Sequence, residues 1–429
     1  MSIEASTASR PPRGDGRSSR VIAALPGALL ACALAGAAEV PADSPADSLA
    51  AAISGGKASL GLRYRYEHVD QDGFTQDADA STLRLRLNYR TREYRNWTGF
   101  AEFDYVGELF PDDFNSGGGT SPGRLQYPVV ADPDGADLNQ LYIDFTGIDA
   151  TRLRAGRQRI LRNNQRFVGG VGWRQNEQTY DGISVRYDGL RNVELEYAWV
   201  IRVNRIFGDR SPVGRNDSNT HLLDASIGLP EGWTLQPYGY YIDDEDVPAF
   251  STMTVGARLV GGIAVGDETL ALTGEFATQA DAASAPVDYT ASYLRFDASL
   301  PVAGQFDVGV GYEVLGGDGN EAGAAFGTPL ATLHAFQGWA DQFLATPDAG
   351  VEDLCVTARW TPSPWTVQAT WHRFEAEAGN ADWGDELDVS VGRRFGDRYG
   401  VLLKAALFDA DDPAFGDVDK FWIMLTADY

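Results

Sequence analysis

Apolar and polar residues alternate along most of the chain from residue 57 onward. In STLRLRLNYR, for example, Leu83 and Leu85 take one set of alternate positions, while Arg84 between them takes the other. A period of two is typical of a β-strand with one apolar and one polar face, because successive side chains point to opposite sides. The pattern therefore predicts an all-β protein.

Such runs recur eighteen times along the chain and are separated by turns. Most have roughly the 9–11 residues that a tilted β-strand needs to cross a membrane. The predicted strands are residues 57–68, 81–92, 97–107, 138–146, 153–160, 179–188, 192–203, 221–229, 233–243, 251–264, 268–279, 288–300, 305–315, 351–361, 365–375, 387–395, 399–409 and 419–429.

The connections between these strands alternate between short and long. Short ones include REYRN, TGIDAT and LPEG, and long ones include residues 108–137, 159–178, 204–220 and 316–350. Bacterial outer-membrane barrels have this organisation, with an even number of antiparallel strands, short periplasmic turns and longer extracellular loops. We therefore predict a transmembrane antiparallel β-barrel of about 18 strands. Its last strand, which ends at Tyr429, is expected to bind the barrel-assembly machinery.

The first residues have the features of a secretory signal peptide. Four arginines precede the apolar run VIAALPGALLACALAGAA, which ends in small residues. We expect residues 1–38 to be a signal peptide, residues 39–56 a short periplasmic segment and residues 57–429 the barrel. Beyond the leader the only cysteine is Cys355, so no intrachain disulfide can form, and no later stretch approaches the roughly 20 apolar residues of a spanning helix.

The charge of the chain limits the kinds of molecule that it can bind. A formal net charge of −26 argues against a nucleic-acid binder, which needs a basic surface. Residues 57–215 contain 22 basic and 22 acidic residues, whereas residues 216–429 contain 9 and 34. Acidic clusters at 243–246 and 409–412 fall in predicted extracellular loops, where they would contact solvent, outer-membrane lipid and lipopolysaccharide, or bind calcium without an EF-hand loop.

Many arginines of the first part fall on the polar face of the strands, which in a barrel faces the lumen. In one interpretation they pair with lumenal carboxylates such as Glu67 and Glu102 and stiffen the wall. In the other they carry anions, because a guanidinium group binds a carboxylate in a bidentate way and a series of weak sites lets an anion pass. The candidate pore residues are Arg63, Arg65, Arg84, Arg86, Arg154, Arg186 and Arg202 in the wall, and Arg157, Arg159, Arg162, Arg166 and Arg174 near or in the connection 159–178, where they would form a constriction.

The sequence gives little support for an enzyme, a cofactor or a metal centre. Its four histidines do not have metal-ligand spacing, and the GxSxG and GxxxxGK[ST] motifs do not occur. We therefore expect no catalytic residues, no cofactor and no metal site.

One long connection differs from the others in its apolar pattern. In GTPLATLHAFQGWADQFLATP (327–347), Leu330, Leu333, Phe336, Ala340, Phe343 and Leu344 are close to helical spacing. We predict an amphipathic helix that either enters the barrel mouth as a constriction or packs on the rim.

Three segments resemble the alginate-export family of outer-membrane proteins. They are NNQRFVGGVGWRQNEQTYDG (163–182), NRIFG (204–208) and GTPLATLHAFQGWADQF (327–343). The resemblance implies a monomeric, eighteen-stranded barrel with an electropositive, arginine-lined constriction that passes an anionic polysaccharide.

These observations predict a channel in the outer membrane of a Gram-negative bacterium. Its solute would be anionic, either an alginate-like uronate polysaccharide or oligosaccharide or a small anion. The alternative is a plugged structural or adhesive barrel with acidic, calcium-binding extracellular loops.

Overall fold

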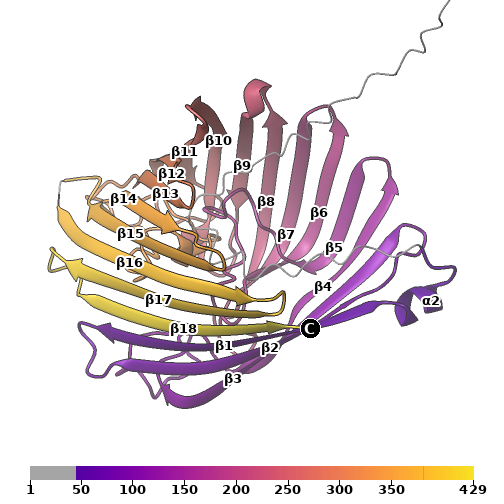
Figure 1. The fold of residues 1–429 in the computed structure, drawn as a ribbon, viewed down its shortest axis with the longest axis horizontal. Helices are drawn as coiled ribbons and strands as arrows, with labels where there is room; N and C mark the ends of the chain where they lie inside the picture. Colours follow the sequence, from indigo (N-terminus) through magenta and orange to yellow (C-terminus); the bar gives the residue numbers. More distant parts are fainter. Residues whose placement is uncertain (1–44, 380) are drawn as a thin grey trace, which may run out of the picture.

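The computed structural model describes residues 45–379 and 381–429, and the strands among them form one closed antiparallel barrel (Figure 1). Each strand pairs with its neighbours in the sequence. The strands are β1 (Lys57–Gln71), β2 (Ala78–Arg90), β3 (Trp97–Asp113), β4 (Gly135–Ile148), β5 (Thr151–Gln158), β6 (Thr179–Leu190), β7 (Val193–Asn204), β8 (Arg215–Gly228), β9 (Thr234–Ile242), β10 (Thr252–Val265), β11 (Glu268–Asp281), β12 (Thr290–Ala303), β13 (Phe306–Leu315), β14 (Val351–Trp360), β15 (Trp365–Glu375), β16 (Asp382–Phe395), β17 (Tyr399–Ala410) and β18 (Val418–Asp428).

Pairing between the first and last strands closes the barrel. β1 and β18 are antiparallel, with Gly61 opposite Asp428 and Gln71 opposite Val418. Figure 1 shows β1 (indigo) beside β18 (yellow). Because β1 also pairs with β2, and β18 with β17, every strand of the barrel has a neighbour on both edges. The predicted eighteen-stranded antiparallel barrel is confirmed.

Helices are few and short in the described residues. They are α2 (Leu49–Ser54), which precedes the barrel, and the 3-10 turns Pro230–Gly232, Pro248–Phe250 and Leu333–Ala335. Within the described ranges, no helix has the length and apolar content of a membrane span. The predicted signal peptide, residues 1–38, lies outside the described residues.

The wall has an apolar outer face and a polar inner face. In β2 the side chains of Leu83, Leu85 and Leu87 are 36–47% exposed, whereas Arg84 and Arg86 are buried. The barrel interior is therefore the only place where these arginines can avoid lipid and find polar partners. The alternation read from the sequence gives the correct face for each of these residues.

Several strands are longer than the sequence pattern predicts. β3 continues to Asp113 beyond the predicted residue 107, and β8 begins at Arg215 rather than at residue 221. The added residues, ELFPDD in β3 and RNDSNT in β8, do not continue the apolar alternation of the predicted strands. Apolar alternation marks only the part of a strand that faces lipid, whereas backbone pairing can continue into water.

The helix predicted at 327–347 is wrong. Only Leu333–Ala335 is helical, and there as a single 3-10 turn. Gln337 and Asp341 have positive φ angles of 55° and 62°, which interrupt a right-handed helix. Most of the apolar side chains are nevertheless buried, since Leu330, Phe336 and Phe343 are at most 6% exposed, whereas Leu344 is 44% exposed. Tertiary burial rather than helix formation therefore accounts for their spacing.

We expect Leu85→Arg to destabilise the barrel by about 2–4 kcal/mol, because Leu85 lies near the middle of β2 on the outer face, where a charge would enter lipid. Leu85→Ala is the matched control and should cost much less. Urea-dependent folding into lipid vesicles measures both variants. Equal stability of the arginine and alanine variants would show that this face does not contact lipid.

Candidate functional site

Three long connections fold into the barrel. They are residues 114–134, 159–178 and 316–350, and each contains a side chain with no exposed surface, namely Phe114, Val168 and Phe326. A surface loop of this length would expose most of its side chains to solvent. The lumen is therefore occupied in part by the protein's own loops.

Residues 159–178 and 327–347, here called the loop pair, bind each other inside the barrel. Val168 and Leu330 form a parallel β-bridge, and Gly169 N donates to Leu330 O at 2.8 Å. The ring of Trp173 stacks on the ring of His334 at a centroid distance of 4.6 Å. Two of the three segments that resemble the alginate-export family therefore take part in a single interior unit.

The loop pair is also attached to the wall on several sides. Arg174 forms an ion pair with Glu67 of β1 at 3.0 Å, and Arg166 Nε donates to Glu313 Oε1 of β13 at 2.7 Å. Ala340 N donates to Oε1 of Glu386 on β16 at 2.8 Å. Contacts to strands this far apart in the wall mean that the loop pair crosses the lumen.

The predicted pore arginines face the barrel interior, and most are paired with carboxylates. Arg86 illustrates the pattern, with Nε 2.7 Å from Asp104 Oδ1 and Nη1 2.7 Å from Glu177 Oε1. The other ion pairs are Arg65 with Asp132, Arg84 with Glu177, Arg154 with Asp144, Arg157 with Asp181, Arg159 with Glu102 and Glu177, Arg162 with Glu196 and Asp224, Arg166 with Glu313, Arg174 with Glu67, Arg186 with Glu194, and Arg202 with Asp217. These contacts fit the wall-stiffening interpretation.

Arg63 differs from the other predicted arginines. Its Nε donates to Gln175 Oε1 at 2.9 Å and its Nη1 donates to Gly172 O at 2.9 Å, so neutral oxygens of the loop take the place of a carboxylate. Burial lowers the stability of an ion that has no counter-charge. Within the described residues, the positive charge of Arg63 is therefore stabilised by the dipoles of neutral oxygens rather than by a salt bridge.

The predicted arginines also differ in how accessible they are. The side chains of Arg186 and Arg202 are 42% and 36% exposed, and that of Arg159 is 21% exposed. By contrast, those of Arg65 and Arg166 are 1% exposed. Solvent reaches the side chains of the first group, whereas Arg65 is buried on the wall and Arg166 is buried within the loop pair.

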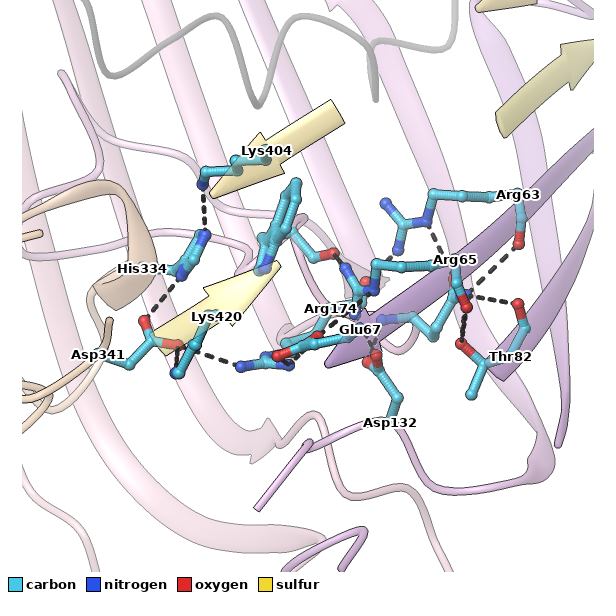
Figure 2. Close-up of polar contacts among 12 residues, drawn as sticks. Arg63, Arg65, Glu67, Thr82, Asp132, Arg174, His334, Asp341, Lys404 and Lys420 are labelled. Atoms are coloured by element: carbon cyan, nitrogen blue, oxygen red, sulfur yellow. Dashed lines mark hydrogen bonds and ion pairs between the residues drawn. The ribbon is translucent and has the colours of Figure 1, made fainter. Parts of the chain in front are cut away.

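The carboxylate of Asp341, in the loop pair, lies at the centre of a cationic site (Figure 2). It accepts hydrogen bonds from His334 Nδ1 at 2.7 Å, Lys420 Nζ at 2.9 Å and Arg174 Nη2 at 3.2 Å. Figure 2 shows Arg174 continuing from this site to Glu67 and the β1 arginines. We call His334, Arg174 and Lys420 the carboxylate site.

A second lysine supports the carboxylate site from β17. Lys404 Nζ lies 2.6 Å from His334 Nε2, and it is 3.6 Å and 4.3 Å from the ring centroids of Trp339 and Trp173. Ammonium groups are stabilised over the faces of tryptophan rings. The aromatic rings therefore help to hold a buried cation next to His334.

The sequence analysis did not single out Lys404, Lys420 or Asp341. Lysine occurs three times in the whole chain, and two of those residues are on neighbouring strands β17 and β18 with their side chains directed inward. They could have been predicted from the sequence as lone lysines on the inner face of a strand, as in VLLKAALF. Their partners in the loop pair could not be read from the sequence, because His334 is 70 residues from Lys404 and Asp341 is 79 residues from Lys420.

His334 is held in its neutral form by its two hydrogen bonds. Its Nδ1–H donates to Asp341, so Nε2 is the acceptor for Lys404 Nζ. Burial, together with the positive charge of Lys404, lowers the pKa of His334 to about 3 even though Asp341 opposes the shift. Protonation of Nε2 would place an N–H against the Lys404 ammonium group.

This arrangement predicts that the loop pair loosens in acid. A histidine whose pKa falls from 6.5 to about 3 on folding contributes stability fully above pH 6.5, and loses it as the pH falls towards 3. The hydrogen-exchange protection factors of residues 327–347, which are corrected for the pH dependence of intrinsic exchange, should therefore fall between pH 6.5 and 4. His334→Gln keeps a donor for Asp341 and should flatten the profile, whereas His68→Gln, at a partly exposed pair with Asp79, should leave it unchanged. The same acid response in His334→Gln would contradict this account.

The contact between the two segments of the loop pair leaves no room for a side chain at Gly169. A Cβ atom there would lie 2.2 Å from Thr332 Oγ1. We expect Gly169→Ala to weaken docking of the loop pair by about 1–3 kcal/mol, as overpacking does elsewhere. Limited proteolysis and hydrogen exchange measure the effect. Gly123→Ala, where nothing lies within 4 Å, is the control, and equal protection of both variants would contradict the prediction.

Comparisons with known proteins agree with this architecture. A family model described as "Alginate export" matches residues 57–296, which is more than half of the chain. No curated protein matches the chain.

The fold is similar to that of solved outer-membrane porins. The structure of Pseudomonas aeruginosa OccK3 (OpdO) is 15% identical, with a TM-score of 0.67 over 89% of this chain and 97% of that one. Acinetobacter baumannii OccAB3 is 13% identical, with a TM-score of 0.67 over 88% and 100%. Pseudomonas aeruginosa OpdK, solved with vanillate, is 14% identical, with a TM-score of 0.67 over 88% and 99%.

At these identities the structural likeness shows the fold, and the family match shows the relationship. Both the family and the porin fold place the protein in the outer membrane of Gram-negative bacteria. The chain belongs to the alginate export family of outer-membrane β-barrel channels.

Proposed function

We propose that this channel conducts an anionic solute, in the first place an alginate-like uronate polysaccharide or oligosaccharide. The observation that carries the proposal is the seating of Asp341 in the carboxylate site. Its oxygens accept from a guanidinium, an ammonium and an imidazole group, which are the donors that a uronate carboxylate would use. The protein's own carboxylate thus occupies a site that suits the solute.

Asp341 belongs to a loop rather than to the wall, and this makes exchange with a solute feasible. Lys420 is on β18, so it would stay in place if residues 327–347 moved. Arg174 would keep its ion pair with Glu67 of β1. An incoming carboxylate could then pair with Lys420 and Arg174 in place of Asp341, so neither of these two buried cations would lose its counter-charge, a loss that would otherwise cost several kcal/mol.

The accessible arginines extend the path beyond the loop pair. Arg157, Arg159, Arg186 and Arg202 lie on or next to β5, β6 and β7, and each forms an ion pair with a carboxylate of the wall. A solute that competes with these carboxylates would bind each site weakly. Weak and repeated sites allow an ion to leave as readily as it enters, which conduction requires.

The proposal also covers the oligomeric state, the surroundings and the assembly of the barrel. The protein would act as a monomer and as a channel rather than an enzyme, with the outer-membrane lipid and lipopolysaccharide around it. The barrel-assembly machinery would bind the last strand, which ends at Tyr429. The twelve arginines predicted to form the pore keep that role here as part of the proposal.

Reversal potentials in planar bilayers under a salt gradient test the proposal. We expect anion preference in the wild type and a smaller preference when Arg162, Arg166 and Arg174 become alanine. Arg210→Ala removes an exposed ion pair with Asp134 and is the matched control. If the triple variant fails to fold, Arg174→Gln alone should still shift the reversal potential towards cations. A cation-selective channel that is indifferent to these changes would refute the anion path.

Asp341→Asn tests the role of the internal carboxylate. The neutral amide should bind Lys420 and Arg174 less strongly, so the loop pair should dock less firmly and the conductance should rise.

A plugged structural or adhesive barrel is the second candidate. The observation that favours it is the loop pair itself, which crosses the lumen and is largely buried. In that case acidic extracellular loops would bind partners or calcium. Absence of single-channel currents in both the folded wild type and Asp341→Asn would support this candidate over the channel.

A further inference from the structure

Three potential metal ligands from two neighbouring strands lie together on the inner face of the wall. Asp353 and Cys355 are alternate residues of β14, and His372 of β15 is paired directly with Cys355. One ligand atom from each of the three residues lies within 4.8 Å of the other two. His372 Nδ1 is 2.8 Å from Asp353 Oδ1. The barrel register, rather than any sequence motif, creates this cluster.

The donor set has the chemistry of a transition-metal site. Thiolate, imidazole and carboxylate groups are the usual protein ligands of Zn²⁺, at roughly 2.0–2.3 Å from the ion. Bringing the three donors to these distances needs small side-chain rotations, because they already lie on adjacent strands of a rigid sheet. An Asp–His pair alone explains the contact between Asp353 and His372, but it gives no role to the inward-facing thiol of Cys355.

A buried carboxylate lies on the other side of His372. Asp388 of β16 has no exposed surface and lies beside the carboxyl group of Glu386, two residues away on the same face of the strand. Its Oδ2 is 3.7 Å from His372 Nε2. Histidines that bind metals commonly donate their second ring N–H to a carboxylate, which fixes the tautomer and orients the ring. Asp388 is placed for that role when Nδ1 is the ligand.

We propose that Asp353, Cys355 and His372 bind a divalent transition-metal ion, with Zn²⁺ as the best match, and that Asp388 is a positioning residue for His372. Binding would convert the Cys355 thiol to a thiolate and release its proton to solvent. The ion would link β14 to β15 across the barrel wall. The site is next to Glu386, which faces His372 across the sheet and holds the backbone of the loop pair at Ala340.

Titration of the purified barrel with Co²⁺ tests the site, because Co²⁺ bound to a thiolate gives an intense charge-transfer absorption band. We expect one Co²⁺ per barrel with this band, and loss of the band when Zn²⁺ is added. Cys355→Ser, which is nearly isosteric, should abolish the band and weaken Zn²⁺ binding at least tenfold. His68→Asn removes the other Asp–His pair between neighbouring strands, which has no cysteine beside it, and should change nothing.

Asp388→Asn separates a positioning role from a ligand role. It should keep the thiolate band but weaken Zn²⁺ binding by about 10–100-fold, as loss of such partners does in other sites. Folding of each variant is checked by the shift in gel mobility of the unheated barrel. Absence of the band in a folded wild type, or Zn²⁺ binding that is unaltered in Cys355→Ser, would overturn the proposal.

Discussion

In the hydrocarbon core of a membrane, an unpaired backbone N–H or C=O costs several kcal/mol, so a sheet can span it only by closing on itself. In this chain the ladder between β1 and β18 provides the closure. Closure also separates the lipid outside from the lumen inside, and successive side chains of a strand face one and then the other. Leu85 faces outward and its neighbour Arg86 faces the interior, where it can find ionic partners.

The interior charges in turn determine how the long loops are held. A buried guanidinium group needs a counter-charge, and the wall supplies only some of them. Residues 159–178 contribute both signs, since Glu177 pairs with Arg86 of β2, while Arg166 and Arg174 pair with carboxylates of β13 and β1. The loop pair is therefore bound by many ion pairs of the kind that an anionic solute could also make. In the function proposed above, retention of the loops and passage of the solute would depend on the same contacts.

The sequence predicts the barrel well, because strand alternation and loop length are local properties. Leu83, Leu85 and Leu87 alternate with arginines for a reason that acts on each residue alone, namely lipid on one side and the lumen on the other. The same reasoning gives the inward direction of Arg86. It cannot give the partner of Arg86, because Glu177 is brought to it by the path of a loop.

The features that the sequence predicts wrongly, or does not predict, depend on contacts between distant segments. The apolar residues of 327–347 have helical spacing, yet they are buried against several strands and form a single 3-10 turn. The carboxylate site joins Asp341 to Arg174 and Lys420, and the proposed metal site joins Cys355 to His372. The carboxylate site depends on loop docking and the proposed metal site on strand register. Neither is therefore visible as a motif in the sequence. Of these site residues, only the inward-facing lysines of β17 and β18 could have been predicted from the strand alternation alone.

The central claim is that a uronate carboxylate can take the place of Asp341 among the cations of the lumen. Interruption of single-channel current by added oligosaccharides tests it most directly, with uronate oligomers compared with neutral oligomers of the same length. The account predicts that uronate oligomers block the current, that neutral oligomers do not, and that Arg174→Gln weakens the block. Equal block by charged and neutral oligomers, or block by uronate that Arg174→Gln leaves unchanged, would contradict it.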